Sequence, residues 1–358
     1  MRVICAPDKL RGALDAAAAA AALATGVRRA GGEPVPLPIG DGGEGTLQAL
    51  VGAGRARCIE LATVDALGRP RIATLGDLGD DVYLVEAAEA IGLAQLDEHE
   101  RDPRRASSRG VARLLAEALA REARQVLVAL GGVATVDGGL GLLAGLGARV
   151  SGESGGSLLG PLDVDVSAVR ARFEATELVV LHDVDVPLCG PDGAAALFGP
   201  QKGLAAADVP LFDAGLARLA TALGRELADR PGAGAAGGLG LALYALGATA
   251  RPGAEAILEL LRFDEHLARA DLCLTAEGSV DRQSAHGKAV SAVVEACARA
   301  GVPCDVLGGV VSDGAVVALK ALGAREVRAI GPAGRPLAEA LAAAEEELAV
   351  AAEESARR

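Results

Sequence analysis

Aromatic side chains are almost missing from this 358-residue sequence, which has no Trp, two Tyr and four Phe. Sites that stack nucleobases and cages that hold organic cations are built from such rings, so the composition argues against both. Basic residues are also in deficit, because 35 Lys and Arg face 48 Asp and Glu and leave a formal charge of -13. Nucleic acids and anionic membranes recruit basic surfaces, so an anionic ligand here needs a local cationic pocket.

Paired cysteine motifs are absent as well. The six cysteines lie far apart, with no C-x-x-C pair and no His at metal-ligand spacing. We therefore expect reduced, mostly buried thiols. The amino terminus becomes charged too soon for a signal peptide and no apolar run approaches 18 residues, so we expect a cytoplasmic protein that binds no membrane. The cysteines are Cys5, Cys58, Cys189, Cys273, Cys297 and Cys304.

Short apolar runs recur along the chain, each followed by a loop rich in Gly and Asp and then by an Ala- and Leu-rich helical stretch. The pattern starts with an apolar run at 2–6 and a helix over 16–29, for which Asp15 is the expected N-cap. Strands that alternate with helices form a largely parallel, covered sheet, so the sequence predicts an α/β fold. The clearest further strands are 126–130, 178–181, 272–275 and 304–310.

Two domains are expected from the length alone. The segment 64–85 has the pattern of a hairpin instead of a crossover, and simple crossover spacing resumes near residue 265. We therefore predict a Rossmann- or flavodoxin-like domain from residues 1–63 and 265–358, with a mixed α/β domain of residues 64–264 inserted. The end of the chain, 337–358, is expected to be a helix that frays into a charged tail.

Polar loops after strands are the places where α/β proteins bind ligands. The loop after 272–275 carries Glu277, Asp281 and Lys288, and Lys288 follows a Gly at the start of a helical stretch. A helix amino terminus with a lysine suits an anion, although a solvated lysine and a turn-forming aspartate explain the pattern equally well.

Three further loops offer charged groups. Asp183 and Asp185 lie two residues apart after a strand, which suits a hard cation, or they simply shape the turn before Pro187. Lys202 lies in a Gly-Pro loop, where a lysine is usually just exposed. Asp41 and Glu44 lie among glycines that let a ligand approach the backbone, or form a tight turn.

Two familiar nucleotide motifs are excluded. The glycines at 232, 234 and 237 spell G-x-G-x-x-G, but Pro231 and a helical stretch precede them where the dinucleotide fingerprint needs a strand. No G-x-x-x-x-G-K-[ST] exists, so a nucleotide-using enzyme with this sequence is not a P-loop one. Among the four histidines, His182 alone follows a strand and is a reasonable site candidate.

Together and in order, these loops resemble the bacterial glycerate kinase family, the P-loop-free type that phosphorylates D-glycerate. Any one motif is weak, but eight in order cover nearly the whole chain. The segments are APDKLRGAL at 6–14, DGGEGT at 41–46, EAAEAIGL at 86–93, GGVATVDGG at 131–139, DVDVPLCGP at 183–191, FGPQKG at 198–203, PGAGAAGGLG at 231–240 and EGSVDRQSAHGK at 277–288.

The resemblance implies a kinase that uses ATP and Mg²⁺, has two α/β domains and binds a small hydroxy acid in the cleft between them. It implies Mg²⁺ ligands at Asp183 and Asp185, catalytic roles for these two residues and for Asp281 and Lys288, and an aspartate, Asp183 or Asp281 by preference, that orients the hydroxyl. The other implied substrate- and phosphate-binding positions are Lys9, Arg11, Asp41, Glu44, Asp137, Lys202 and Glu277.

Departures from the family pattern fall on small polar positions. Val133, Val136, Val186 and Ala276 stand where the family usually carries Ser, Asn or Thr, Asn, and Gly. A site that binds hydroxyl groups loses discrimination when its polar partners go. The expected activity is phosphorylation of D-glycerate, with 2-phosphoglycerate as the favoured product and 3-phosphoglycerate as the other possible product. The alternatives are a kinase of a less polar hydroxy acid and a regulatory binding protein without turnover.

Overall fold

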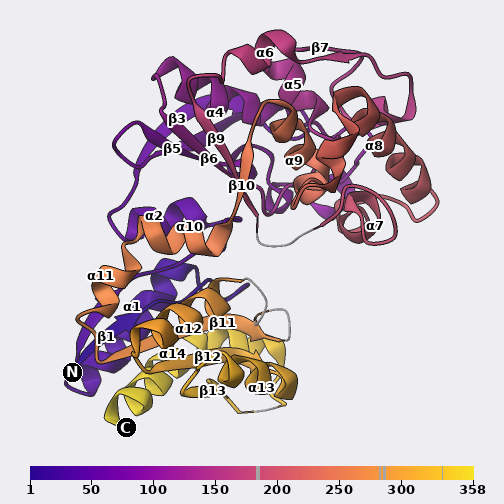
Figure 1. Cartoon of the computed structure of the whole chain (residues 1–358). Coiled ribbons are helices and arrows are strands. Elements are labelled where there is room, and N and C mark those ends of the chain that lie inside the picture. Colours follow the sequence, from indigo (N-terminus) through magenta and orange to yellow (C-terminus); the bar gives the residue numbers. More distant parts are fainter. Residues whose placement is uncertain (183–185, 282–283, 285–287, 333) are drawn as a thin grey trace. The chain divides into compact units, whose positions relative to one another are not determined.

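The computed structural model describes residues 1–182, 186–281, 284, 288–332 and 334–358. The chain forms two compact units (Figure 1), and each is described by itself: unit 1 comprises 1–41, 45–55 and 252–358, and unit 2 comprises 42–44 and 56–251. Both main divisions fall earlier than the expected 63/64 and 264/265. β3 (Arg57–Val64) belongs to unit 2 because it pairs along its whole length with β4 (Pro70–Asp77). α10 (Gly253–Leu260) packs on α12 (Ala289–Ala300) of unit 1.

Unit 1 is built on a five-stranded sheet in the order β13-β12-β11-β1-β2. All four pairings are parallel, so buried apolar strands such as β1 are covered on both faces. Numbered within the unit, the order is 2-1-3-4-5, that of flavodoxin-like sheets, whose topological switch point lies between the first and third strands, here β1 and β11. The strands are β1 (Arg2–Cys5), β2 (Glu33–Pro36), β11 (Leu272–Val280), β12 (Cys304–Val311) and β13 (Glu326–Ala329).

The helices of unit 1 cover both faces of this sheet. α1 (Ala16–Arg29) and α14 (Leu337–Arg357) pack on each other. Together with one face of the sheet they enclose an apolar core. α12 packs on β11 and β12, and its neighbours α10 and α11 (Phe263–Leu267) pack against it. The remaining helices are α2 (Thr46–Gly52) and α13 (Asp313–Ala321).

Unit 2 holds a six-stranded mixed sheet in the order β10-β9-β6-β5-β4-β3. β3, β4 and β5 form an antiparallel meander, whereas β5, β6 and β9 are parallel. The other strands of the sheet are β5 (Val82–Glu86), β6 (Gln125–Ala129), β9 (Glu177–His182) and β10 (Thr249–Pro252), and β7 (Arg149–Val150) pairs with β8 (Val164–Asp165) beside it.

A large apolar core fills unit 2 between the sheet and its helices. Since the chain has few aromatics, Leu, Val and Ala make up most of this core, and Phe212 is among its largest fully buried side chains. The helices are α3 (Ala87–Ile91), α4 (Arg109–Ala120), α5 (Leu140–Leu146), α6 (Ser167–Ala171), α7 (Ala194–Phe198), α8 (Val209–Leu223) and α9 (Ala235–Ala245). Short 3-10 helices are η1 (Leu93–Gln95), η2 (Glu98–Glu100), η3 (Gly155–Leu159), η4 (Pro200–Lys202) and η5 (Arg225–Asp229).

The α/β class predicted from the sequence is confirmed by the two sheets. Asp15 is the N-cap of α1 and accepts a 2.7 Å hydrogen bond from the Ala18 N–H. The hairpin expected within 64–85 is present as β4 and β5. One detail differs: α14 continues to Arg357 instead of fraying, because its buried side is packed on α1. Within the described residues, no helix combines the length and apolarity needed to cross a membrane.

Candidate active site

At the switch point of unit 1, the loop after β1 lies on β11. The Asp8 N–H donates to the Ala276 carbonyl at 2.9 Å. A Cβ at Gly278 would lie 3.0 Å from the Arg11 nitrogen, so the absence of a side chain lets the loop approach the strand. These backbone contacts hold Asp8 and Glu277 in one neighbourhood.

Asp8 is a nearly buried carboxyl in a negative environment. It is 8% exposed, and burial, together with the charge of Asp41, raises its pKa to about 7 despite the opposing effect of Lys9. Asp41 comes into range because the chain after β2 runs beside β1, where the Ile39 N–H donates to the Pro7 carbonyl at 3.0 Å. Glu277 also raises the pKa of Asp8.

Glu277 is the second member of this carboxylate group. Burial raises its pKa, and Asp281 and Asp41 add to that effect, while a hydrogen bond from Ser284 and the charge of Lys288 lower it. Its Oε2 atom is buried and has no hydrogen-bond partner among the described residues. An oxygen of this kind, among carboxylates, is a fit ligand for a hard cation.

Lys288 brings positive charge to the same neighbourhood. It is the N-cap residue of α12, and its carbonyl accepts hydrogen bonds from the Ser291 hydroxyl at 2.9 Å and the Ala292 N–H at 3.0 Å. The helix therefore starts at Ala289, as the sequence predicts, and its first N–H groups and the Lys288 ammonium suit an anionic group. Lys9 and Arg11, in the loop after β1, add two further cationic side chains.

Three loops that are distant in the sequence meet in unit 2. The Lys202 Nζ donates to the Thr135 carbonyl at 2.8 Å, which joins η4 to the loop 131–139. The Gly138 N–H donates to the Gly237 carbonyl at 3.0 Å, which joins the same loop to α9. Residues Ala236 to Gly238 have left-handed backbone angles, so α9 is kinked where it touches this loop. Three family motifs thus form one connected structure.

Asp137 organises this structure from inside. Its carboxylate is fully buried and accepts bonds from the Ser108 N–H and hydroxyl, both at 2.7 Å, and from the backbone N–H groups of Gly139 at 3.0 Å and Gly141 at 3.2 Å. Burial raises its pKa against the effect of these bonds. In this position Asp137 shapes the loop and contacts no open surface, which differs from the direct binding role that the resemblance implies.

Lys202 is equally unlike the exposed lysine that the sequence favours. It is 3% exposed, and burial lowers its pKa to about 8, although the charge of Asp137 acts in the opposite direction. A buried lysine that donates to a backbone carbonyl holds the loop 131–139 in place.

The loop 41–46 is divided between the two units. Asp41 belongs to unit 1, whereas Glu44 belongs to unit 2 and lies against the loop 131–139. A Cβ at Gly132 would be 2.9 Å from the Glu44 Cβ. Glu44 is exposed, so its carboxylate is accessible to a ligand.

Asp183 and Asp185 lie outside the described residues, so their predicted metal-binding role stays a prediction. The neighbouring His182 ends β9 and lies beside the loop 231–240, since a Cβ at Gly232 would be 3.1 Å from the His182 Cβ. A 3-10 helix, η5, precedes this loop, so the strand required by the dinucleotide fingerprint is not there.

The three valines at positions where the chain departs from the family pattern are buried. Val133, Val136 and Val186 are 3%, 0% and 4% exposed. Val133 and Val136 are part of the apolar core of unit 2, and Ala276 belongs to that of unit 1. These side chains fill the interior, so the departures do not by themselves make an open binding surface less polar.

Sequence reasoning missed Asp8, although it named Lys9 beside it. The available signal was its position directly after a buried strand, the same signal that drew attention to Asp183. Reasoning also missed the left-handed kink in α9, for which the run of Gly and Ala at 231–240 was the signal.

These features define a doubly wound α/β protein that gathers carboxylates and lysines at its switch point. The family model described as "Glycerate kinase family" matches residues 3–358. The chain is 38% identical to a glycerate kinase of Bacillus subtilis (strain 168) over 87% of its own length and 86% of that protein. It is 37% identical to a glycerate 2-kinase of Escherichia coli (strain K12), over 80% of each.

A solved structure, described as a glycerate kinase 2 from Salmonella typhimurium LT2, has a similar fold. Its TM-score is 0.84 at 33% sequence identity, and the match covers 99% of this chain and 97% of that one. The chain belongs to the glycerate kinase family, as its motifs indicate.

Proposed function

We propose that this protein transfers the terminal phosphoryl group of ATP to D-glycerate and that the product is 2-phosphoglycerate. Family membership supports the reaction, and the relative named glycerate 2-kinase supports the position of transfer. The observation that carries the proposal is the pairing of buried carboxylates with Lys288 at the switch point. Phosphoryl transfer needs cationic groups on the phosphates and carboxylates for a metal ion, and this edge supplies both.

The carboxylate group fits Mg²⁺. The charges of Asp41 and Glu277 raise the pKa of Asp8, and the charge of Asp41 also raises the pKa of Glu277. The Glu277 Oε2 has no hydrogen-bond partner among the described residues. Mg²⁺ bound there would neutralise charge on the phosphates and relieve the repulsion among the carboxylates. Asp183 and Asp185, which lie outside the described residues, stay our predicted Mg²⁺ ligands.

The side chains have distinct proposed roles. Lys9, Arg11 and Lys288 bind phosphate or carboxylate oxygens, and Lys288 stabilises charge that develops during transfer. Asp281 or Asp183 orients the acceptor hydroxyl. In unit 2, Glu44 faces the ligand, while Asp137 and Lys202 hold the loop 131–139 in place. We also propose that the chain is a flavodoxin-like domain from both chain ends with a mixed α/β domain inserted.

The activity is tested by measuring ATP consumption with a panel of hydroxy acids. We expect D-glycerate to be the best acceptor. Phosphorus NMR of the product identifies the site of transfer, because phosphate on the secondary carbon couples to one proton and phosphate on the terminal carbon to two. Greater turnover of a less polar acid, or binding without turnover, would overturn the proposal.

The metal assignment is tested without turnover. We expect Mg²⁺ to raise the melting temperature of the native protein and to have little effect on Glu277→Gln, because this variant lacks the carboxylate at the buried position. Glu295→Gln, an exposed position on α12, is the matched control and keeps the native response. An equal Mg²⁺ response in all three proteins would remove Glu277 from the site.

A further inference from the structure

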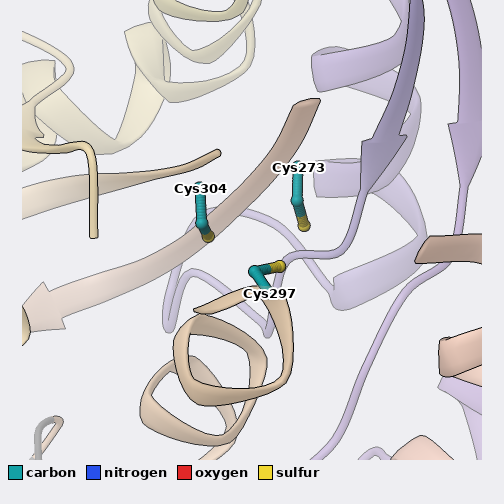
Figure 2. Close-up of side chains that lie close together, drawn as sticks. All are labelled: Cys273, Cys297 and Cys304. Carbon is teal, nitrogen blue, oxygen red and sulfur yellow. The ribbon is translucent and has the colours of Figure 1, made fainter. Parts of the chain in front are cut away.

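Three cysteines that are scattered in the sequence converge inside unit 1 (Figure 2). Cys273 on β11 and Cys304 on β12 are direct partners in the parallel register, and Cys297 on α12 faces them. The three sulfur atoms all lie within 4.8 Å of one another. All three residues are 0% exposed.

This cluster is separate from the candidate active site. Glu277 follows Cys273 by four residues along β11, a distance of about 13 Å in a strand. Cys5 also lies in the sheet of unit 1, but it belongs to the core on the face covered by α1 and α14, whereas Cys273 and Cys304 face α12. The cluster is therefore a distinct internal group that the phosphoryl-transfer chemistry does not use.

The number and arrangement of sulfur atoms favour three-coordinate binding. With a metal–sulfur bond of about 2.3 Å, three sulfurs around one centre stand about 4 Å apart. This separation is compatible with three sulfurs that all lie within 4.8 Å of one another. Among the described residues, no fourth His, Cys, Asp or Glu ligand atom joins the group. Structural Zn²⁺ is almost always bound by four ligands, and full burial provides no solvent-facing fourth position.

The net charge of the complex distinguishes a divalent or monovalent metal ion from a trivalent centre. Burial raises the pKa of Cys273, and hydrogen bonds from Cys273 and Cys304 lower that of Cys297, so the thiols share their protons as a group. The charges of Cys297 and Asp305 both raise the pKa of Cys304, and Asp305 accepts hydrogen bonds from Arg325 at 2.6 and 2.7 Å. Three thiolates around Zn²⁺ or Cu⁺ would leave buried negative charge, which is costly. Three thiolates around a trivalent centre leave none.

We propose that Cys273, Cys297 and Cys304 form a binding site for a trivalent arsenical. Arsenous acid loses its three hydroxides, each of which takes the proton of one thiol and leaves as water, and three arsenic–sulfur bonds form. Arsenic stays in the +3 state throughout, so no oxidant or reductant is needed. The neutral complex joins β11, β12 and α12, and it stabilises the folded unit because an unfolded chain does not hold the three thiols together.

The first test counts bonds in the native protein. The protein is incubated with arsenite, and a second sample is refolded from denaturant in its presence so that burial does not prevent access. We expect a mass gain of one arsenic less three hydrogens, three sulfur neighbours in arsenic X-ray absorption, and a higher melting temperature. No arsenic bound in either sample, or fewer than three sulfur neighbours, would overturn the site.

The second test uses substitutions. Cys297→Ala should weaken arsenite binding at least about tenfold, since one of three bonds is lost. It should still bind phenylarsine oxide, which needs only two thiols, and a native circular dichroism spectrum shows that the variant is folded. Cys5→Ala makes a similar buried truncation on the other sheet face, and Cys58→Ala removes the exposed thiol. Both should bind arsenite as the native protein does, and loss of binding in either would contradict the assignment.

Zn²⁺ and Cu⁺ are the competing occupants. Each is added to the reduced native protein under the same conditions, and its effect on the melting temperature is compared with that of arsenite. We expect arsenite to give the largest increase because its complex is neutral. A larger increase with Zn²⁺ or Cu⁺ would overturn the choice of a trivalent centre.

Discussion

At the scale of the residue, Lys288 has two roles: its backbone caps α12, and the charge of its ammonium group lowers the pKa of Glu277. Lys288→Met removes the charge and keeps much of the side-chain volume. We expect kcat to fall by about 10²-fold or more, as for the loss of a contact to the charge that develops during transfer. Steady-state kinetics with ATP and D-glycerate measure this change.

The control for this variant is Lys320→Met, an exposed lysine on α13 of the same unit. It should retain native kcat, and both variants should keep the native circular dichroism spectrum. A native kcat in Lys288→Met would remove this lysine from the phosphate site.

Lys202 makes the stability of unit 2 increase with pH in the alkaline range. Its pKa is about 8 in the folded protein, whereas an ordinary lysine has a pKa of 10.5, so the folded state loses this proton first. Burying the charge therefore costs stability below pH 8, and this cost disappears as pH rises toward 10.5. The free energy of unfolding of the native protein should gain up to about 3 kcal/mol relative to Lys202→Met over this range.

Urea unfolding at several pH values between about 7 and 10.5 measures the difference. Lys320→Met is again the control and should follow the native pH profile. If native protein and Lys202→Met change in parallel, Lys202 is not a buried charged amine.

At the scale of elements, the kinked segment of α9 contacts the loop 131–139 and connects it to the loop 231–240 of unit 2. Gly237 has φ +68°, and a Cβ there would lie 2.0 Å from the Thr135 carbonyl oxygen. Gly237→Ala therefore combines backbone strain with a steric clash, and we expect a loss of roughly 3 kcal/mol or more in the free energy of unfolding. Since the clash displaces the loop 131–139, activity should fall as well.

Gly247→Ala is the control that introduces backbone strain without a steric clash. Gly247 has φ +100°, and a Cβ added there would have no neighbouring atom within 4 Å, so only the backbone cost of about 1 kcal/mol is expected. Activity should stay native in this control. Equal losses of stability in the two variants would mean that the contact with Thr135 is unimportant.

Local patterns predict the elements of this fold well and their contacts poorly. The apolar run of β1 and the cap at Asp15 are signals within a few residues, and both elements form as expected. The domain limits differ because pairing of β3 with β4 and packing of α10 on α12 are contacts between elements. Such contacts leave no mark on hydropathy or turn composition.

The same reasoning explains the site. Charged loops after strands could be found because parallel strands end at one edge. This logic drew attention to Glu277 and Lys288, whose roles stay predictions. The burial of Asp137 and Lys202 could not be found, because it depends on loops that are distant in the sequence. The three-cysteine cluster was missed for a similar reason: Cys273 and Cys304 become neighbours only through strand register.

At the scale of the whole molecule, substrate choice depends on whether the valine departures touch the acceptor. Val136 is fully buried in the core of unit 2, so we expect it to affect stability and not recognition. The native protein should use D-glycerate with kcat/KM near about 10⁴ M⁻¹s⁻¹ or above, an ordinary enzyme efficiency. A hydroxy acid with methyl in place of hydroxymethyl should be a much poorer substrate, because the polar partners of the missing hydroxyl stay unpaired.

Val136→Thr tests this expectation directly. The added hydroxyl is buried without an assigned partner, so the free energy of unfolding should fall by about 1–3 kcal/mol while the preference between the two acids stays unchanged. Val186→Asn, at a position that is 4% exposed, provides a second test at another departure. If native turnover of D-glycerate is poor and either variant raises it, the valines do contact the acceptor. The protein would then be a family member whose acceptor has changed while its phosphoryl-transfer residues have stayed.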